Sequence, residues 1–296
     1  MPHSITDQVV LITGAARGIG AETARRLAAR GARLALVGLE PDRLAALAAE
    51  LGPAHRWWEC DVTDQRAVEG AVAGAVEALG GIDVVIANAG IATNGTVAVT
   101  PADALVRVVE VNLCGVLRTV SATLPHVTAR RGYYLLVSSA AAVAPMPGLS
   151  AYAASKSGVE MFGNVLRVEA ARHGVRVGVA HPCWIDTDLV RDIQHDLSSF
   201  NEALRKLPGP FGTVTTVDAC ADAFVAAIAR RARKVFIPRS IGPLAAIRQI
   251  FASPLAEWVL RRQAREALPR LEGEVRALGR PFGRNSVGMG GQSRVE

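Results

Sequence analysis

The amino-acid sequence predicts an α/β fold: a doubly wound parallel sheet of about seven strands with helices on both faces. Short apolar runs alternate with longer segments of helical periodicity along most of the 296 residues. Two of these runs, 34–37 and 84–87, are apolar at every position, which is typical of parallel strands buried on both faces. A glycine-rich loop follows the first predicted strand of the chain, and folds of this class bind ligands at such a loop. We therefore expect one α/β domain rather than two.

The predicted elements alternate along the chain. Strands are expected at about residues 8–13, 33–38, 56–60, 82–87, 132–138, 175–180 and 234–237. Helices are expected at about residues 18–30, 41–51, 64–79, 101–129, 150–173 and 216–231. This order predicts a domain over residues 1–240. A helical C-terminal extension at 241–282, packed on the core, and a disordered tail at 283–296 would follow it.

The expected C-terminal extension has an amphipathic pattern. Ser253 followed by Pro254 is typical of a helix cap and a first helical position. Apolar residues recur along one stripe: Leu255, Trp258, Val259, Leu271, Val275 and Leu278. Arg261, Arg262 and Arg265 would face water. Because the stripe is narrow, we expect it to dock on the core or on a neighbouring subunit; its tryptophan and arginines also permit a membrane-surface helix, which we favour less.

A glycine-rich loop lies between the first predicted strand and the first predicted helix. Gly14, Gly18 and Gly20 stand at the spacing of a dinucleotide-binding loop. In such a loop one glycine permits a tight turn, a second lets the backbone approach a pyrophosphate, and a third lets the helix pack on the strand. The helix N-terminus adds unpaired amides and a partial positive charge. Strand, loop and helix in this order predict a Rossmann-type dinucleotide site.

Tyr152 and Lys156 form the most informative pair in the chain. On a helix, residues four apart are surface neighbours, so this spacing holds an ammonium beside a phenol. A nearby positive charge favours the phenolate and lowers the pKa of the phenol toward the neutral range, which predicts a general acid/base. The alternative is a surface tyrosine on an ordinary amphipathic helix. With only three tyrosines and three lysines in the chain, a chance pair at this spacing is rare.

Composition argues against several other kinds of site. The four cysteines lie far apart, without a Cys-x-x-Cys pair or a His/Cys cluster, so we expect no metal site. The formal net charge is +6, but residues 230–296 carry fourteen Lys or Arg against five Asp or Glu, so the basic character belongs to the C-terminal part. No nucleic-acid motif accompanies it. With no membrane-spanning stretch and no signal-peptide pattern, a cytoplasmic protein is expected.

Together these motifs resemble those of the classical short-chain dehydrogenase/reductase (SDR) family, over roughly residues 5–240. The glycine spacing is that of the family, and residues 88–90 match its Asn-Ala-Gly turn. Residues 182–187 match its Pro-Gly-x-Ile-x-Thr segment, except that Cys183 replaces the glycine. The resemblance implies these cofactor-binding residues: Gly14, Arg17, Gly18, Ile19, Gly20, Asp61, Val62, Asn88, Ala89, Gly90, Tyr152, Lys156, Pro182, Ile185 and Thr187. Among them, Asp61 would contact the adenine.

The resemblance also implies four catalytic residues, Asn112, Ser139, Tyr152 and Lys156. Tyr152 would donate or accept the proton, and Ser139 would hydrogen-bond the reacting oxygen. Lys156 would lower the pKa of Tyr152 and hold the nicotinamide ribose, while Asn112 would support a water linked to Lys156. The implied reaction is a hydride transfer with NAD or NADP that interconverts a secondary alcohol and a ketone. Taken alone, Ser139 is typical of a turn and Asn112 of a structural helix residue.

The choice between NAD and NADP depends on the end of the second predicted strand. An acidic residue there usually binds the ribose 2′-hydroxyl of NAD, but Gly38 and Leu39 occupy that region. Glu40 lies close by, although an acidic residue there is also typical of a helix N-terminus. Arg17 could pair with the 2′-phosphate of NADP. We therefore favour NADP over NAD.

The expected substrate is a small hydrophobic alcohol or ketone. Met146, Leu149 and Trp184 are candidate contacts together with Ser139, and residues 183–212 lie where the family keeps its substrate-binding loop. We also expect a homo-oligomer, either a dimer or a homotetramer. Two other functions stay open. One is a catalytically silent dinucleotide-binding regulator or scaffold, and the other is a lipid-modifying reductase at a membrane surface.

Overall fold

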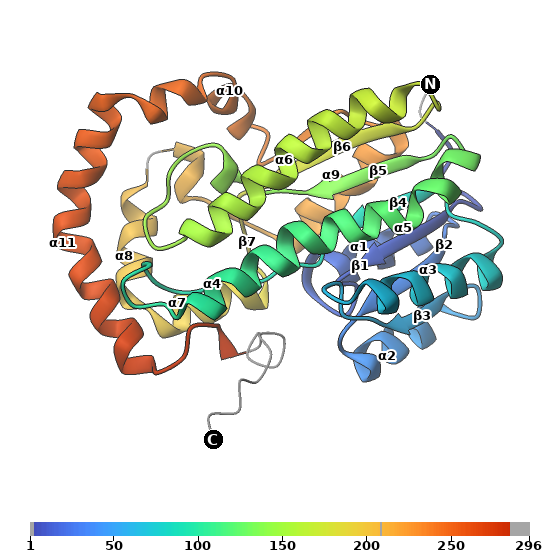
Figure 1. Ribbon diagram of the computed structural model, residues 1–296, viewed down its shortest axis with the longest axis horizontal. Coiled ribbons are helices and arrows are strands. Elements are labelled where there is room, and N and C mark those ends of the chain that lie inside the picture. The colour runs from blue at the N-terminus through green and yellow to red at the C-terminus, as the bar shows by residue number, and fades with distance from the viewer. Residues whose placement is uncertain (1–2, 208, 285–296) are drawn as a thin grey trace.

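The computed structural model describes residues 3–207 and 209–284 and contains a seven-stranded parallel sheet (Figure 1). The strand order is β3-β2-β1-β4-β5-β6-β9. The strands are β1 Val9–Thr13, β2 Arg33–Gly38, β3 Arg56–Glu59, β4 Val84–Ala87, β5 Tyr133–Val137, β6 Arg176–Pro182 and β9 Lys234–Ile237. This confirms the predicted α/β fold. β1 pairs with β2 along one edge and with β4 along the other, so the strand order reverses direction at β1.

Helices cover both faces of the sheet. The first face carries α1 Gly18–Ala28, α2 Pro41–Leu51 and α9 Val217–Arg230, and the second carries α3 Gln65–Leu79, α5 Gly115–Ala129 and α6 Ser150–Ala171. Side chains alternate across each strand, so one strand supplies both cores. In β1, Ile12 packs in the cluster that contains Phe224, whereas Leu11 packs in the cluster that contains Val120. Both cores therefore fix the carboxyl edge where the loops gather.

The predicted helix over residues 101–129 is divided in the structure. Helix α4 covers Ala102–Val109, a π-helical turn covers Glu110–Cys114, and α5 then begins at Gly115. Asn112 lies in the π-turn and is fully buried. A π-turn inserts one extra residue into a helix and is frequent at functional sites. No Pro or Gly lies within this turn, so the sequence gives no breaker signal for it.

Residues 183–212 hold more regular structure than the expected loop. They contain β7 Trp184–Ile185, α7 Asp188–Asp196, α8 Ser198–Lys206 and the 3-10 turn η3 Gly209–Gly212. The short strand β7 pairs in parallel with β8 Val214–Thr215 and closes the segment on itself. A second 3-10 turn, η2 Ala140–Ala142, follows β5 directly.

The predicted helical C-terminal extension is present. It consists of α10 Ile241–Ala246, the 3-10 turn η4 Arg248–Ala252 and α11 Pro254–Leu278. Figure 1 shows these elements as an arch around the end of the molecule that holds α7 and α8. Leu271, Val275 and Leu278 pack there with Ile193 and Leu197. No helix among residues 3–207 and 209–284 combines the length and the apolar character needed to cross a lipid bilayer.

The first half of α11 does not dock on the core as expected. Leu255, Trp258 and Val259 are 72%, 59% and 40% exposed. The partly buried residues of this half recur every four positions on a different side of the helix: Ala256, Leu260 and Ala264. Two alanines and Leu260 are therefore partly buried, whereas Leu255, Trp258 and Val259 lie in water. Docking of the stripe on a neighbouring subunit stays a prediction, and residues 285–296 of the expected tail lie outside the described residues.

Candidate active site

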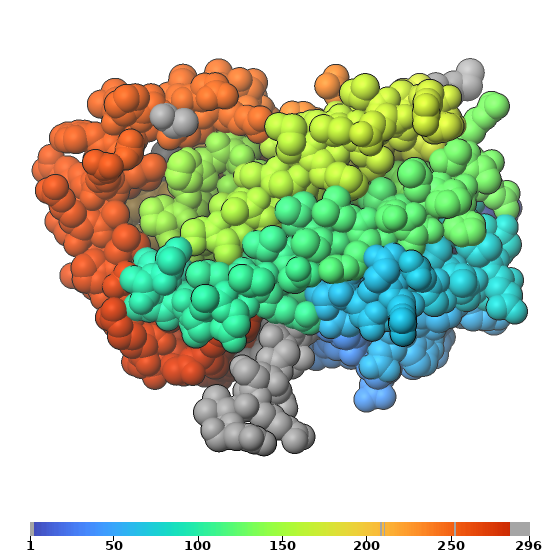
Figure 2. All heavy atoms as spheres, in the orientation of Figure 1, coloured from blue at the N-terminus to red at the C-terminus, as the bar shows by residue number. Residues whose placement is uncertain are grey.

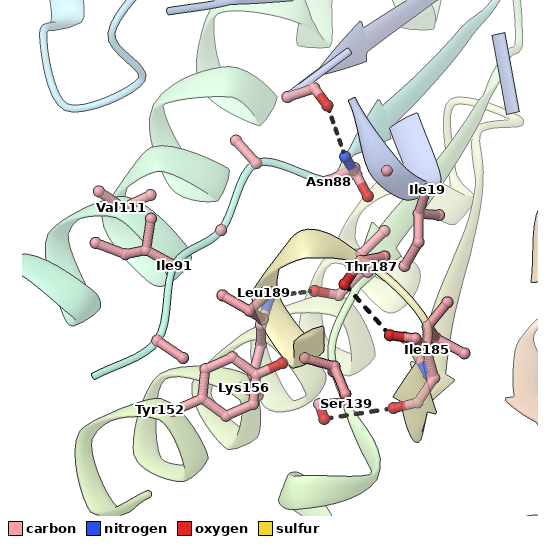
Figure 3. Close-up of a pocket in the computed structure, with 18 of the residues that line it drawn as sticks. Ile19, Asn88, Ile91, Val111, Ser139, Tyr152, Lys156, Ile185, Thr187 and Leu189 are labelled. Carbon is pink, nitrogen blue, oxygen red and sulfur yellow. Dashed lines mark hydrogen bonds between the residues drawn. The ribbon is translucent and has the colours of Figure 1, made fainter. Parts of the chain in front are cut away.

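A large pocket lies at the carboxyl edge of the sheet (Figure 3). Its walls come from the glycine loop, the ends of β2, β4, β5 and β6, and residues of α6 and α7. The predicted site residues that line it are Gly14, Arg17, Gly18, Ile19, Asp61, Val62, Asn88, Ala89, Gly90, Ser139, Met146, Leu149, Tyr152, Lys156, Pro182, Trp184, Ile185 and Thr187. Gly20 and Asn112 lie behind the wall. The structure thus brings together segments that are far apart in the sequence.

The glycine loop is packed tightly against the end of β4. Gly14 has a φ of +65°, and a Cβ atom there would lie 2.9 Å from the Cα atom of Ala89. A Cβ atom on Gly20 would collide with the carbonyl oxygen of Gly14. The side-chain amide of Asn88 donates to the carbonyl oxygens of Thr13 and Gly14, at 3.0 and 3.2 Å. Only glycine fits at both positions, and Asn88 holds the loop in place.

The start of α1 offers an anion-binding surface. The residue before the helix, Arg17, provides no side-chain cap for the helix, and Gly18 and Ile19 line the pocket. Amides of the first helical turn lack intrahelical acceptors, and the helix dipole adds partial positive charge there. Together with the close-packed glycine loop, this arrangement fits the pyrophosphate of a dinucleotide.

Asp61 lies at the end of the pocket beyond β3. One carboxylate oxygen accepts from the backbone amide and the hydroxyl of Thr63, both at 2.8 Å, and the other accepts from Arg107 at 2.8 Å. Burial alone would raise the pKa of Asp61, but Thr63 and Arg107 together bring this pKa below its ordinary value. The carboxylate is therefore ionised and oriented at the pocket edge, beside Val62.

Three charged residues meet where the pocket passes the end of β2. The Arg17 guanidinium contacts Glu40 at 3.1 Å and Asp188 at 3.3 Å. Glu40 directly precedes α2, as expected for an acidic residue at a helix N-terminus, and its side chain also lines the pocket. A second cation, Arg43, contacts Glu40 at 3.4 Å, but Arg43 does not line the pocket, whereas Arg17 and both carboxylates do. On the pocket lining itself, two carboxylates therefore accompany one cation, an arrangement that the sequence did not predict.

Tyr152 lies in the first turn of α6 and faces the same space as Ser139 (Figure 3). Burial raises the pKa of Tyr152, and the opposing influence of the Ser139 hydroxyl is smaller. The net direction is opposite to the sequence prediction, in which Lys156 lowers this pKa. The physical reason is that burial disfavours the charged phenolate more strongly than its polar neighbours favour it. The phenol is therefore protonated throughout the neutral range.

Lys156 is buried one helical turn further along α6. Its ammonium donates to the carbonyl oxygen of Val137 at 2.8 Å and lies 5.7 Å from the centre of the Tyr152 ring. Because burial disfavours the charged form, the pKa of Lys156 falls to about 8. The lysine therefore lies beside the phenol as predicted and titrates near neutrality.

Asn112 connects the π-turn to the loop after β4. Its side-chain oxygen accepts from the Ile91 amide at 2.8 Å, while its nitrogen donates to the Ile91 carbonyl at 2.9 Å and to Ser155 at 3.1 Å. The same side-chain oxygen lies close to Gly90, as does the Lys156 ammonium. Asn112 thus supports the pocket wall from behind and does not line it.

The two neighbouring serines after β5 differ in what they contact. The Ser139 hydroxyl accepts from the Ala141 amide at 3.1 Å and donates to the Pro182 carbonyl at 3.4 Å. The Ser138 hydroxyl donates instead to the carbonyl oxygen of Lys156, within the backbone of α6, at 2.7 Å. Ser138 therefore attaches α6 to β5. Ser139, with a long and weak bond of its own, is the serine available to a ligand.

The part of the pocket where substrate is expected is lined largely by apolar residues. Met146 and Leu149 line it as predicted, while the Trp184 indole donates to the Phe211 carbonyl at 2.8 Å and so also holds its own segment. The sequence did not identify several further wall residues: Ile91, Ala92, Val111, Val190 and Ile193. The helical spacing of Leu189, Val190 and Ile193 was a signal for the two residues of α7, obscured by the charged residues of that helix. Burial raises the pKa of the Cys183 thiol to about 11, so it stays protonated.

The C-terminal segment supports this apolar wall from outside. Phe282 packs in one buried cluster with Ile91 and Val111, next to Tyr152, and it forms an isolated bridge with Thr93. The Glu274 carboxylate accepts from the hydroxyls of Ser198 and Ser199 and from the Ser199 amide at the start of α8. A further ion pair joins Arg280 to the buried Asp196. Residues beyond 270 therefore hold both helices of the substrate segment.

Known proteins share this architecture and sequence. The model of the short chain dehydrogenase family matches residues 8–198. A glycine betaine reductase of Emericella nidulans is 37% identical over 212 residues, which make up 70% of this chain and 16% of that protein. The dehydrogenase/reductase SDR family member 7B of Bos taurus is 38% identical over 197 residues, 62% of this chain and 60% of that protein. The chain thus matches only part of the length of each relative.

Among solved structures, a 3-ketoacyl-(acyl-carrier-protein) reductase from Brucella melitensis in complex with NADH is similar, with a TM-score of 0.71 and 26% identity. The alignment covers 79% of this chain and 98% of that protein. About a fifth of this chain therefore has no counterpart in that structure.

Proposed function

The chain belongs to the short-chain dehydrogenase family and is an oxidoreductase, and we propose that it reduces a hydrophobic ketone to a secondary alcohol with a nicotinamide cofactor. The observation that carries this proposal is the convergence of Tyr152, Ser139 and Lys156 on one pocket that also contains the glycine loop. The pocket therefore joins an acid/base group to a surface suited to a dinucleotide.

In the proposed reaction the nicotinamide would supply a hydride to the carbonyl carbon. Tyr152 donates its phenolic proton to the carbonyl oxygen as that oxygen becomes negative. Ser139 donates a hydrogen bond to the same oxygen and so stabilises its developing charge. The raised pKa of Tyr152 supports the reductive direction, because a proton donor must hold its proton at neutral pH.

Lys156 and Asn112, the other two predicted catalytic residues, have different roles: Lys156 contacts the cofactor, and Asn112 acts through the protein. Lys156 lines the pocket, where its ammonium can bond the ribose hydroxyls of the cofactor. Asn112 is a positioning residue in this proposal, because its amide groups already bond both backbone groups of Ile91. It fixes the loop after β4 against the pocket.

We propose NAD(H) as the preferred cofactor, in place of the NADP that the sequence favoured. Arg17 is paired with Glu40 and Asp188, so a 2′-phosphate would meet two carboxylates and one cation on the pocket lining. The second cation, Arg43, contacts Glu40 but does not line the pocket. A 2′-phosphate and these carboxylates would repel each other because both are negative. NAD, which has no 2′-phosphate, would bind without this repulsion. Glu40 is also placed to accept a hydrogen bond from a ribose 2′-hydroxyl.

The cofactor proposal is tested by removing the Glu40 charge. In Glu40→Gln, the dissociation constant of NADP relative to that of NAD should fall by on the order of tenfold, because one repulsive carboxylate is lost. Glu50→Gln, which removes a carboxylate paired with Arg25 on the outer surface of α2, is the matched control and should leave the ratio unchanged. A parent protein that already binds NADP more tightly than NAD would refute the proposal.

The catalytic proposal is tested with Tyr152→Phe in a panel of ketones and each cofactor. Turnover should fall by on the order of 10²–10⁴, with cofactor affinity retained, since only the phenolic oxygen is removed. Tyr133→Phe is the control, because Tyr133 begins β5 at the edge opposite the pocket and its hydroxyl bonds the Ala232 carbonyl. Unchanged turnover in Tyr152→Phe would contradict the assignment. Cofactor binding without turnover of any ketone by the parent would favour a silent regulator.

A further inference from the structure

Five large apolar side chains are exposed where η4 meets α11. We call this group the corner patch: Ile247, Ile250, Leu255, Trp258 and Val259. Among the described residues, this thirteen-residue stretch holds five of the thirteen large apolar side chains that are exposed. Figure 2 shows the arch at the outer edge of the molecule, on the left of the view. Such a concentration of exposed apolar area marks a contact surface.

We propose that the corner patch binds the surface of a membrane that contains anionic phospholipids. Trp258 and its aliphatic neighbours would enter the boundary between headgroups and acyl chains, with the start of α11 lying in the plane of the surface. Tryptophan suits this boundary because its ring is largely apolar and its indole N–H can still bond to polar groups.

The charges around the patch match an anionic surface. Arg262 and Arg265 follow Trp258 by four and seven residues, which puts them on the same side of α11. Among the ion pairs of the described residues, neither arginine has a carboxylate partner, whereas Arg261 pairs with Glu257 at 2.7 Å. Residues 230–296 carry an excess of nine positive charges over the whole C-terminal part. Long arginine side chains can reach headgroup phosphates while their stems cover apolar surface.

A second copy of the chain fits the patch less well than lipid does. A two-fold interface brings the same surface of both copies together, so each patch would face its own equivalent. Arg262 and Arg265 would then oppose the same cations of the partner, and like charges repel. Anionic headgroups supply the missing opposite charge without this conflict.

Docking through the patch would leave the pocket intact. The second half of α11 holds Leu271, Val275 and Leu278 in the buried cluster with Ile193. The patch lies on the exposed first half, away from these contacts. Variants in the patch should therefore keep their activity in solution. Retained activity shows that a variant is folded, so its loss of lipid binding cannot come from unfolding.

The test measures co-sedimentation of the full chain with vesicles. Binding should be strong to phosphatidylcholine vesicles containing about one-third phosphatidylglycerol, weak to pure phosphatidylcholine, and reduced by salt. Trp258→Glu, and separately Arg262→Glu with Arg265→Glu, should each lower the partition coefficient by on the order of tenfold. Trp57→Glu is the matched control: Trp57 is also exposed, but it lies in β3 at the opposite end of the molecule (Figure 1).

The proposal is overturned by equal binding to both kinds of vesicle, by full binding of Trp258→Glu, or by an equal loss in Trp57→Glu. Light scattering in solution adds a separate readout. A lower mass for Trp258→Glu than for the parent would assign the patch to self-association and overturn the lipid proposal. An unchanged mass, with lost binding to anionic vesicles, supports it.

Discussion

Burial affects Tyr152 and Lys156 in opposite directions, because it disfavours the charged form of each. The phenol keeps its proton above its ordinary range, and the ammonium gives up its proton at about pH 8. Near neutral pH the pocket therefore holds a neutral proton donor beside a cation. Above pH 8 the Tyr152 phenol still holds its proton, while Lys156 has lost its positive charge. Each of the two residues should thus control a different measurable property.

Cofactor affinity should depend on pH through Lys156. The pKa of this lysine is about 8, so it is charged below that value and neutral above it. The dissociation constant should rise between about pH 7 and pH 9, as the positive charge near the dinucleotide is lost. Calorimetric titration across this range measures it.

The matched variants are Lys156→Met and Lys206→Met. Lys156→Met should bind cofactor more weakly and without this pH dependence, whereas Lys206→Met, on α8 outside the pocket, should follow the parent. A pH dependence that persists in Lys156→Met would assign the titration to another group.

At the residue level, local patterns predicted which side chains form the site but not their ionisation. The spacing of Tyr152 and Lys156 and the spacing of the glycines are short-range signals. Tyr152, Lys156, Gly14 and Gly18 do line one pocket. The direction of the Tyr152 pKa depends on how deeply distant segments bury it. Arg17 is a similar case, since Asp188 reaches it from 171 residues away in the chain.

The arch formed by α10, η4 and α11 is attached at both ends. Near its start, Arg248 contacts the buried Glu160 of α6 at 2.8 Å. Burial alone would raise the pKa of Glu160, but its His181, Arg248 and Lys234 neighbours lower that pKa to about 2. Glu160 follows Lys156 by one helical turn. The arch is thus joined at one end to α6, which carries Tyr152 and Lys156, and at the other to α7 and α8.

Removing the Glu274 carboxylate should weaken substrate binding selectively. Glu274 caps the start of α8, and loss of a helix cap costs about 1 kcal/mol, or roughly a fivefold change in an equilibrium constant. Glu274→Ala should therefore raise KM for the ketone about fivefold with little effect on the cofactor dissociation constant. Glu266→Ala, exposed on the same helix, is the control. A parallel loss of cofactor affinity would mean that the arch supports the whole domain.

Helical periodicity predicted the elements better than it predicted their contacts. The pattern from Ser253 onward correctly indicates a helix, yet it cannot tell which side faces the protein. That choice depends on the surface that the helix meets, and in the structure Ala256 and Ala264 are on the partly buried side. The π-turn at Asn112 is likewise set by hydrogen bonds to Ile91 rather than by its own five residues.

The whole molecule presents a second exposed apolar stripe, on α6. Met161, Val165 and Val168 recur at i, i+4 and i+7 and are all exposed. Since isolated globular surfaces seldom keep such a stripe, we expect it to form the contact of the predicted homo-oligomer. Val165→Glu should therefore lower the mass measured by light scattering, because a charge would be buried in the interface.

Val97→Glu serves as the control for this prediction, since Val97 is a similarly exposed apolar residue away from α6. Both variants should keep the helical content of the parent. If the parent is already monomeric, the stripe has another partner and the prediction of a homo-oligomer is wrong.

Phe282 completes the wall behind Ile91 although almost two hundred residues separate them in the chain. During synthesis the seven strands can pair once β9 has left the ribosome, and the glycine loop then has all its supports. The apolar wall at Ile91 and Val111 lacks one of its contacts, Phe282, until residue 282 follows. A ribosome-bound chain short of that point would hold a dinucleotide without selecting a substrate. We therefore expect translation to complete the glycine-loop side of the pocket before it completes the apolar wall.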